Sequence, residues 1–178
     1  MTPEELKALV RTVPDFPAPG IQFRDITTLL GHGPGLAATI EHLSTSARDF
    51  GAEAVAGMEA RGFIFGAAVA ARLGIGFVPV RKPGKLPIAT ITEEYALEYG
   101  SDRLEMDPDA IADGQRVVMV DDLIATGGTA LAAASLLRRA GGDVAGACFV
   151  IDLPDLGGAQ LLRDDGLAVS ALMDFPGH

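Results

Sequence analysis

The sequence VVMVDDLIATGGT, residues 117–129, decides the fold class of this 178-residue chain. Val117–Val120 form an apolar, β-branched-rich run that is typical of a strand buried on both faces of a sheet. Two adjacent carboxylates, Asp121 and Asp122, follow this run and lead into a Thr-Gly-Gly-Thr turn that opens a helix. Ligands of open α/β sheets bind beyond the carboxyl ends of the strands. The stretch therefore predicts an α/β fold with a ligand site at this turn.

The turn has the composition of a phosphate site. Its two adjacent glycines accept the dihedral angles of a tight turn in which successive N–H groups face one point, and the following helix directs its positive end there. Adjacent glycines without a following Gly-Lys-Ser/Thr disfavour both a dinucleotide fingerprint and a Walker A loop. The alternative is a helix cap with two turn glycines. The predicted phosphate-binding residues are Ala125, Thr126, Gly127, Gly128 and Thr129.

The acidic pair beside this turn needs partners of its own, because two carboxylates repel a phosphate. Ribose hydroxyls, which donate hydrogen bonds, or a divalent cation would remove the conflict. A sugar phosphate meets both demands. Asp121 and Asp122 are therefore candidates for binding ribose hydroxyls and a metal-bound sugar phosphate, and the alternative is a solvated strand end.

Composition narrows the class of protein. A hydrophobic content of 48% with 22 glycines favours a compact α/β enzyme over a disordered chain, and a net charge of −10 disfavours nucleic acid or an anionic membrane as partner. The single cysteine, Cys148, lies in an apolar run and is expected to be a buried thiol. We expect a cytoplasmic protein, since no segment has the character of a signal peptide or a membrane span.

Strand and helix patterns alternate along the chain, which predicts one domain over residues 1–178 built on a right-handed parallel sheet. A capping box formed by Thr2 and Glu5 predicts a first helix ending near Arg11. An irregular segment is expected over 14–20, an exposed hairpin over 90–106 with its turn at 100–102, and a frayed tail over 174–178. Further helices are expected over 34–50, 63–73, 129–140 and 157–163, and strands over 54–57, 76–81, 116–121, 144–151 and 167–173.

The stretch over 117–129 resembles the phosphoribosyl pyrophosphate (PRPP) motif of type I phosphoribosyltransferases. In both, an apolar strand is followed by Asp-Asp, two further residues and Ala-Thr-Gly-Gly-Thr. Four further segments are similar, in order, to those of the adenine-using members of this family. The resemblance implies an α/β fold with a central, mostly parallel sheet flanked by helices, a flexible hairpin lid and a small N-terminal hood. The four segments are Asp15–Thr27, Glu59–Gly66, Val80–Pro87 and Ala96–Met106.

The same resemblance implies an activity: transfer of the phosphoribosyl group of PRPP to adenine in purine salvage, giving AMP and pyrophosphate in a homodimer. Mg²⁺ is the implied cofactor, held mainly by PRPP, with Asp121 and Asp122 as possible ligands. The loop over 58–62 is implied to bind pyrophosphate through Arg61, with a cis peptide bond between Glu59 and Ala60. The implied basic loop contributes Arg81, Lys82 and Lys85, with Arg81 the expected donor to the neighbouring subunit.

Two further sets of residues complete the implied site. Glu98 is the candidate general acid or base acting on adenine, and Tyr99 would pack over the closed site as part of the lid. Phe23 offers a face for purine stacking, while the backbone of Gln22 and Arg24 would contact the base edge. The simpler alternatives are the charged outer face of an exposed hairpin and a core phenylalanine.

Two other functions remain open at the level of sequence. Hypoxanthine, guanine or xanthine could replace adenine, because discrimination between these bases depends on a few hydrogen-bond directions. A non-catalytic PRPP-sensing regulator would need an added DNA-binding segment, for which neither terminus has room, and the acidic net charge opposes it.

Overall fold

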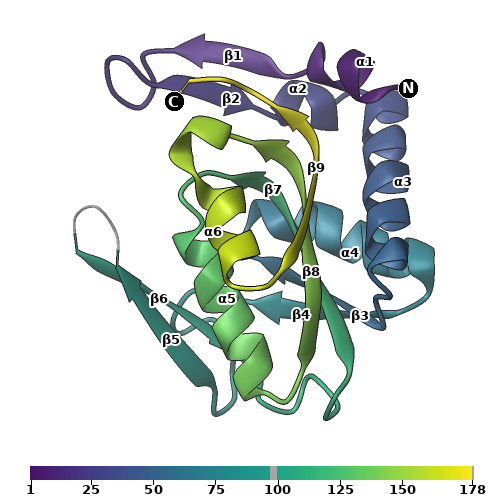
Figure 1. The fold of residues 1–178 in the computed structure, drawn as a ribbon, viewed down its shortest axis with the longest axis vertical. Coiled ribbons are helices and arrows are strands. Elements are labelled where there is room, and N and C mark those ends of the chain that lie inside the picture. The colour runs from purple at the N-terminus through teal and green to yellow at the C-terminus, as the bar shows by residue number, and fades with distance from the viewer. Residues whose placement is uncertain (97–99, 178) are drawn as a thin grey trace.

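The computed structural model describes residues 1–96 and 100–177. Its core is a five-stranded sheet in the order β4-β3-β7-β8-β9, in which every neighbouring pair is parallel (Figure 1). The strands are apolar because both faces of the sheet are covered. Their bounds are β3 (Ala54–Met58), β4 (Gly76–Val80), β7 (Arg116–Ile124), β8 (Asp143–Asp152) and β9 (Ala168–Asp174).

The strand order reverses between β3 and β7, which are hydrogen-bonded neighbours. From β3 the chain crosses to β4 on one side, whereas from β7 it continues to β8 and β9 on the other. Such a switch point leaves a crevice at the carboxyl ends of the two strands, where doubly wound folds bind ligands. The segments that follow β3 and β7 are therefore the ones that the topology brings together.

Helices cover both faces of the sheet. Phe65 and Val69 of α4 pack with Val118 and Val120 on one face, together with α3. The alternate residue Met119 faces the opposite side, against α5 and α6. Among the described residues, no helix combines the length and the hydropathy needed to cross a membrane. The helices are α1 (Pro3–Lys7), α2 (Thr27–Leu30), α3 (Gly33–Asp49), α4 (Arg61–Leu73), α5 (Gly128–Arg139) and α6 (Gly158–Asp164), with a 3₁₀ turn η1 (Pro154–Leu156).

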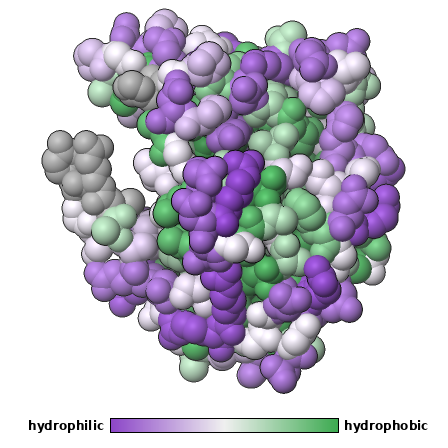
Figure 2. Space-filling view, in the orientation of Figure 1, coloured by the Kyte–Doolittle hydropathy of each residue, from purple (hydrophilic) through white to green (hydrophobic). Residues whose placement is uncertain are grey.

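Two antiparallel hairpins stand outside the main sheet. β1 (Arg11–Pro14) pairs with β2 (Gln22–Asp25), and we call this hairpin the hood. β5 (Ile91–Ala96) pairs with β6 (Ser101–Met106). Figure 1 places the hood at the top of the molecule and β5–β6 at the lower left. In the space-filling view a hollow separates the two hairpins (Figure 2).

The structure corrects the expected boundaries near the hood. Helix α1 begins with the predicted capping box but ends at Lys7 rather than near Arg11, because Arg11 enters the hairpin and pairs with Asp25. The segment over 14–20, expected to be irregular, includes the end of β1 and the loop to β2.

Three further expectations are wrong. Strand β7 continues to Ile124, so the two aspartates lie inside it, because β8 pairs with β7 as far as Asp152. Residues 101–102 belong to β6 rather than to the turn. The tail does not fray over 174–177, since Phe175 is buried and its N–H donates to the carbonyl of Asp152 at 3.0 Å.

Candidate active site

A cleft of about 250 Å³ opens at the switch point between β3 and β7. It is walled by the segment that follows β3, by the end of β7 and by the turn that leads into α5. The predicted phosphate turn, Arg61, Lys82 and the two aspartates thus share one cavity. Its lining is Met58, Glu59, Ala60, Arg61, Lys82, Asp121, Asp122, Leu123, Ile124, Ala125, Thr126, Gly127, Gly128, Thr129, Ala130 and Phe149.

The phosphate turn ends in a left-handed residue. Gly127 has φ 87° and ψ −5° and precedes the first residue of α5, Gly128. Glycine adopts this conformation without the penalty that a Cβ atom imposes. Within the described part of the chain no side chain caps α5, so the N–H groups of its first turn remain available at the cleft.

A glycine of another element supports this turn from behind. The N–H of Gly158, at the start of α6, donates to the carbonyl of Ala125 at 2.9 Å. A Cβ atom on Gly158 would lie 2.3 Å from that oxygen and 2.7 Å from the nitrogen of Gly127. Sequence analysis gave Gly158 no role, and the adjacent Gly157 was the available sign of a close backbone approach.

The two aspartates occupy different environments. Asp122 is 5% exposed and forms an ion pair with the Nε of Arg61. Asp121 accepts a hydrogen bond from the N–H of Asp122 at 2.8 Å through Oδ1. Burial, followed by the negative charge of Asp122, raises the pKa of Asp121 well above 3.8, and Arg61 offsets only part of this rise. Asp121 is thus a carboxylate that lacks a full complement of positive partners.

Close packing at the start of α4 holds Asp121 in place. A Cβ atom on Gly62 would lie only 2.8 Å from Oδ1 of Asp121. The peptide bond between Glu59 and Ala60 is cis, as the resemblance implied. Arg61, whose side chain is 59% exposed, extends from this loop toward Asp122.

The basic loop after β4 divides its side chains between two directions. Lys82 lines the cleft, whereas Arg81 and Lys85 lie outside the cleft lining in the described part of the chain. The Nε of Arg81 is 3.4 Å from Oε1 of Glu59, and its guanidinium lies 5.7 Å from the centre of the Phe63 ring. Lys85 is exposed. The structure therefore brings one of the three predicted basic residues into this cavity.

Hairpin β5–β6 contributes a polar network that sequence analysis missed. The Tyr95 hydroxyl accepts hydrogen bonds from Thr129 Oγ1 and Lys82 Nζ, both at 3.3 Å, and donates to Asp102 at 3.2 Å. Lys82 also forms an ion pair with Asp102. For Tyr95, the available signal was the alternation of side chains along β5, which places Tyr95 and Thr92 on opposite faces of the strand. The predicted residues Glu98 and Tyr99 lie outside the described residues.

A second cavity, of about 420 Å³, lies under the hood and shares Arg61 with the cleft. The ring of Phe23 meets that of Phe16 edge to face, with centroids 5.1 Å apart. Of the predicted base-binding residues, Phe23 and Arg24 line this cavity, and Gln22 lies next to them in β2. The lining is Val13, Phe16, Phe23, Arg24, Asp25, Ile26, Thr27 and Arg61.

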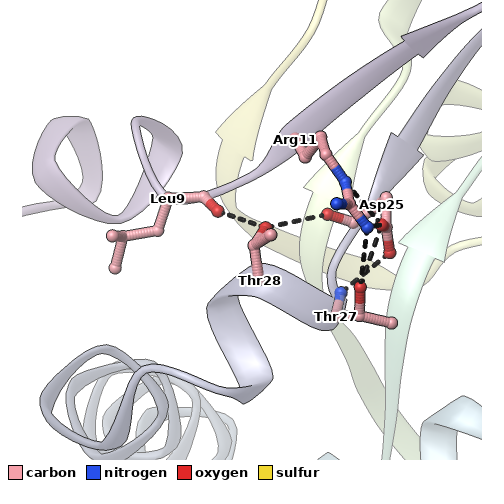
Figure 3. Close-up of polar contacts among 5 residues, drawn as sticks. All are labelled: Leu9, Arg11, Asp25, Thr27 and Thr28. Atoms are coloured by element: carbon pink, nitrogen blue, oxygen red, sulfur yellow. Dashed lines mark hydrogen bonds and ion pairs between the residues drawn. The ribbon is translucent and has the colours of Figure 1, made fainter.

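Asp25, which had no role in the sequence analysis, joins the hood to α2 (Figure 3). Its Oδ2 accepts from Arg11 Nε at 3.0 Å and from Thr27 Oγ1 at 2.9 Å, and its Oδ1 accepts from the N–H of Thr27 at 2.9 Å. Hydrogen bonds from Thr27 and Arg11 lower the pKa of Asp25 to about 2. The hydroxyl of Thr28 donates to the carbonyl of Leu9 at 2.6 Å beside them.

Comparison with known proteins identifies the family. The sequence profile of the phosphoribosyl transferase domain matches residues 28–170. The adenine phosphoribosyltransferase of Novosphingobium aromaticivorans is 74% identical over 178 residues and all of both chains. The crystal structure of adenine phosphoribosyltransferase from Thermoanaerobacter pseudethanolicus is 49% identical, with a TM-score of 0.93 over 98% of this chain and 100% of that chain.

A third relative, the APRTase of Giardia lamblia, was solved in complex with 9-deazaadenine. It is 31% identical, with a TM-score of 0.91 over 98% of each chain. The chain belongs to the phosphoribosyltransferase family. Within this family it is an adenine phosphoribosyltransferase, a pentosyltransferase that converts adenine and PRPP to AMP and pyrophosphate. The comparisons do not favour another purine base or a non-catalytic regulator.

Proposed function

We propose that residues 1–178 act as one domain that forms AMP in the switch-point cleft, with adenine entering from the cavity under the hood. The observation that carries this proposal is the shared lining of the cleft, where the glycine turn and the aspartate pair lie side by side. Ala125, Thr126, Gly127, Gly128 and Thr129 bind the 5′-phosphate through backbone N–H groups and hydroxyls.

Asp121 and Asp122 bind the ribose hydroxyls. Hydroxyl donors supply the buried Asp121 with the partners that it lacks in the free enzyme. As pyrophosphate leaves with the electrons of the C1–O bond, the sugar becomes cationic, and nearby carboxylates stabilise that charge. Arg61 turns from Asp122 to the pyrophosphate oxygens, which a guanidinium binds in a bidentate manner.

Lys82 contacts pyrophosphate in its own cleft, while Arg81 reaches the cleft of a partner subunit and Lys85 contributes positive charge to the same loop. The separation of Lys82 from its neighbours supports this division. The enzyme is then a homodimer with shared sites. Sedimentation equilibrium tests this: a monomer with full activity would contradict it.

Mg²⁺ is held mainly by the phosphates of PRPP. Carboxylate oxygens suit this ion, and Asp121 and Asp122 are the acids that the cleft offers it. Among the described residues no group of three or more His, Cys, Asp or Glu side chains is placed to hold a metal ion. When bound, the ion neutralises charge on the leaving pyrophosphate.

Adenine stacks on Phe23, and the backbone of Gln22 and Arg24 contacts its edge. The apolar cavity next to Arg61 supports this position, as does the Giardia relative solved with 9-deazaadenine. N9 of adenine attacks C1 of the sugar as the C1–O bond to pyrophosphate breaks, and Glu98 accepts the proton that the base loses and returns it in the reverse reaction. Tyr99 and hairpin β5–β6 act as a lid that excludes water.

Glu98→Gln tests the assignment of the proton to this side chain. We expect kcat to fall about 10²- to 10⁴-fold, because the amide cannot exchange the proton, while the Kd for PRPP stays nearly constant. Steady-state kinetics at saturating adenine and PRPP measure kcat, and PRPP titration measures Kd. An unchanged kcat would contradict the assignment.

The reaction itself is tested with purified enzyme, PRPP, Mg²⁺ and a panel of free bases. We expect AMP and pyrophosphate with adenine and much slower turnover with hypoxanthine, guanine and xanthine. Pyrophosphate release with another base at the adenine rate would contradict the base assignment. We further propose that the enzyme works in the cytoplasm, where nucleotide salvage takes place.

A further inference from the structure

The segment after β9, residues 175–177, forms a strap that runs beside the hood (Figure 1). It is anchored to the body of the molecule at two points. The N–H of Phe175 donates to the carbonyl of Asp152 at 3.0 Å, and the N–H of Gly177 donates to Asp155 Oδ2 at 2.7 Å. Phe175 is only 9% exposed. The strap is therefore a fixed part of the fold that meets a hairpin far away in sequence.

Arg24 is the residue through which the hood contacts the strap. Its guanidinium lies 4.7 Å from the centre of the Phe175 ring, and its Nη2 donates to the carbonyl of Pro176 at 3.0 Å. Its Nη1 donates to Thr12 Oγ1 at 2.7 Å, which joins β2 to β1. One side chain thus links both strands of the hood to the strap.

The guanidinium depends on these contacts because it is partly withdrawn from water. The Nε of Arg24 is buried and has no hydrogen-bond partner among the described residues. The remaining donors and the aromatic face of Phe175 must therefore stabilise the cation. Loss of either strap contact would leave a partly buried guanidinium with fewer partners, and β2 would shift to relieve it.

The position of β2 matters because this strand lines the cavity under the hood. Phe23 and Arg24 both line that cavity. Because neighbouring residues of a strand direct their side chains to opposite faces, the guanidinium of Arg24 meets the strap on the face of β2 opposite to the Phe23 ring. The Asp25 network holds the last residue of β2 next to α2. Arg24 holds the strand at the residue directly after Phe23. The strap therefore acts on the part of the hood that would contact adenine.

We propose that Arg24, Phe175 and Pro176 are positioning residues for the adenine pocket: the strap fixes β2, and β2 presents Phe23 and its backbone to the base. This inference rests on the proposed location of adenine under the hood. The side chain of Arg24 then positions β2, whereas its backbone contacts the edge of the base. It also predicts that adenine binding, rather than PRPP binding, depends on the strap.

The test uses Arg24→Met and Phe175→Leu, which remove the cation and the ring with little change in volume. We expect KM for adenine to rise roughly 3- to 20-fold in each, as the loss of one cation–π contact or charged hydrogen bond allows. We expect kcat and KM for PRPP to stay within about twofold, because Arg24 and Phe175 lie outside the lining of the cleft that holds the phosphate turn. A merely destabilised enzyme would not show this split.

Arg48→Met is the matched control for the loss of one cation. Arg48 is exposed in α3, away from the strap and the hood, so KM for adenine should not change. The double variant Arg24→Met with Phe175→Leu should be no worse than Arg24→Met alone, because Arg24→Met already removes the contact with the Phe175 ring together with the hydrogen bond to Pro176. Arg24→Lys keeps a cation at the ring and should restore part of the adenine affinity.

The inference is overturned if both single variants keep the parent KM for adenine, if KM for PRPP rises equally, or if Arg48→Met has the same effect. If Arg24→Met does not fold, Arg24→Lys and Phe175→Leu decide the outcome by the same measurements. Phe23→Ala separates this inference from the pocket assignment. An unchanged KM for adenine in Phe23→Ala overturns the pocket, whereas a raised KM there with parent behaviour in the strap variants overturns the strap alone.

Discussion

At the scale of single residues, Asp121 shows how a ligand-binding group costs stability in the free enzyme. Its carboxylate is buried beside a second carboxylate, and both effects raise its pKa above 3.8. A raised pKa in the folded state means that the folded protein holds this proton more tightly than the unfolded chain. The stability contributed by Asp121 therefore falls as pH rises from 3.8 through the raised pKa.

Asp121→Asn should remove this cost while abolishing function. The amide still accepts the hydrogen bond from the N–H of Asp122. We expect Tm at pH 7 to rise by about 2–4 °C, which corresponds to roughly 1 kcal/mol, and turnover to fall at least about a hundredfold. Differential scanning calorimetry from pH 4 to pH 8 provides an internal control, because the gain in Tm should shrink toward low pH. A lower Tm at pH 7 would contradict this account of Asp121.

At the scale of elements, the phosphate turn depends on α6, which packs behind it. Gly158→Ala would place a methyl group against the Ala125 carbonyl and the Gly127 nitrogen. We expect the turn to shift and KM for PRPP to rise about tenfold or more, since small displacements of positioning groups have large effects. Gly76→Ala is the matched control, because a Cβ atom there meets nothing within 4 Å. Equal kinetics for the two variants would show that α6 does not support the turn.

Hairpin β5–β6 and the basic loop are joined by the ion pair between Asp102 and Lys82. Lys82 must leave this partner before it can bind pyrophosphate. Asp102→Asn should therefore lower KM for PRPP by about two- to fivefold with little change in kcat, which is the size expected of a partly exposed pair. Asp109→Asn, an exposed acid outside the network, controls for the change in net charge. A raised KM for PRPP in Asp102→Asn would indicate that Asp102 positions Lys82 rather than competes for it.

At the scale of the whole molecule, the order of strands and helices could be predicted because apolar runs and glycine turns are local signals. The apolar run Val117–Val120 was enough to predict the central strand, and the family resemblance predicted the cis peptide bond between Glu59 and Ala60. The length of β7 could not be predicted, because Asp121 and Asp122 interrupt its apolar run, and pairing with β8 is what holds the strand together as far as Ile124.

The parts of the site that escaped prediction all depend on tertiary contacts. Tyr95 meets Thr129 across 34 positions of sequence, and Arg24 meets Pro176 across 152. Phe175 also packs against distant partners, Lys7 and Arg24, whereas the proline and the glycine that follow it suggest a free tail. Such pairings leave no local pattern, so they became visible only when the fold brought the segments together.

At the scale of the whole molecule, one sheet edge is expected to bind a nucleoside monophosphate in a single orientation. A crystal structure of the enzyme with AMP tests this most directly. We predict the phosphate at the N–H groups of residues 125–129, the ribose hydroxyls at Asp121 and Asp122, and the adenine ring against Phe23. A phosphate bound away from this turn, or an adenine ring outside the cavity under the hood, would contradict it.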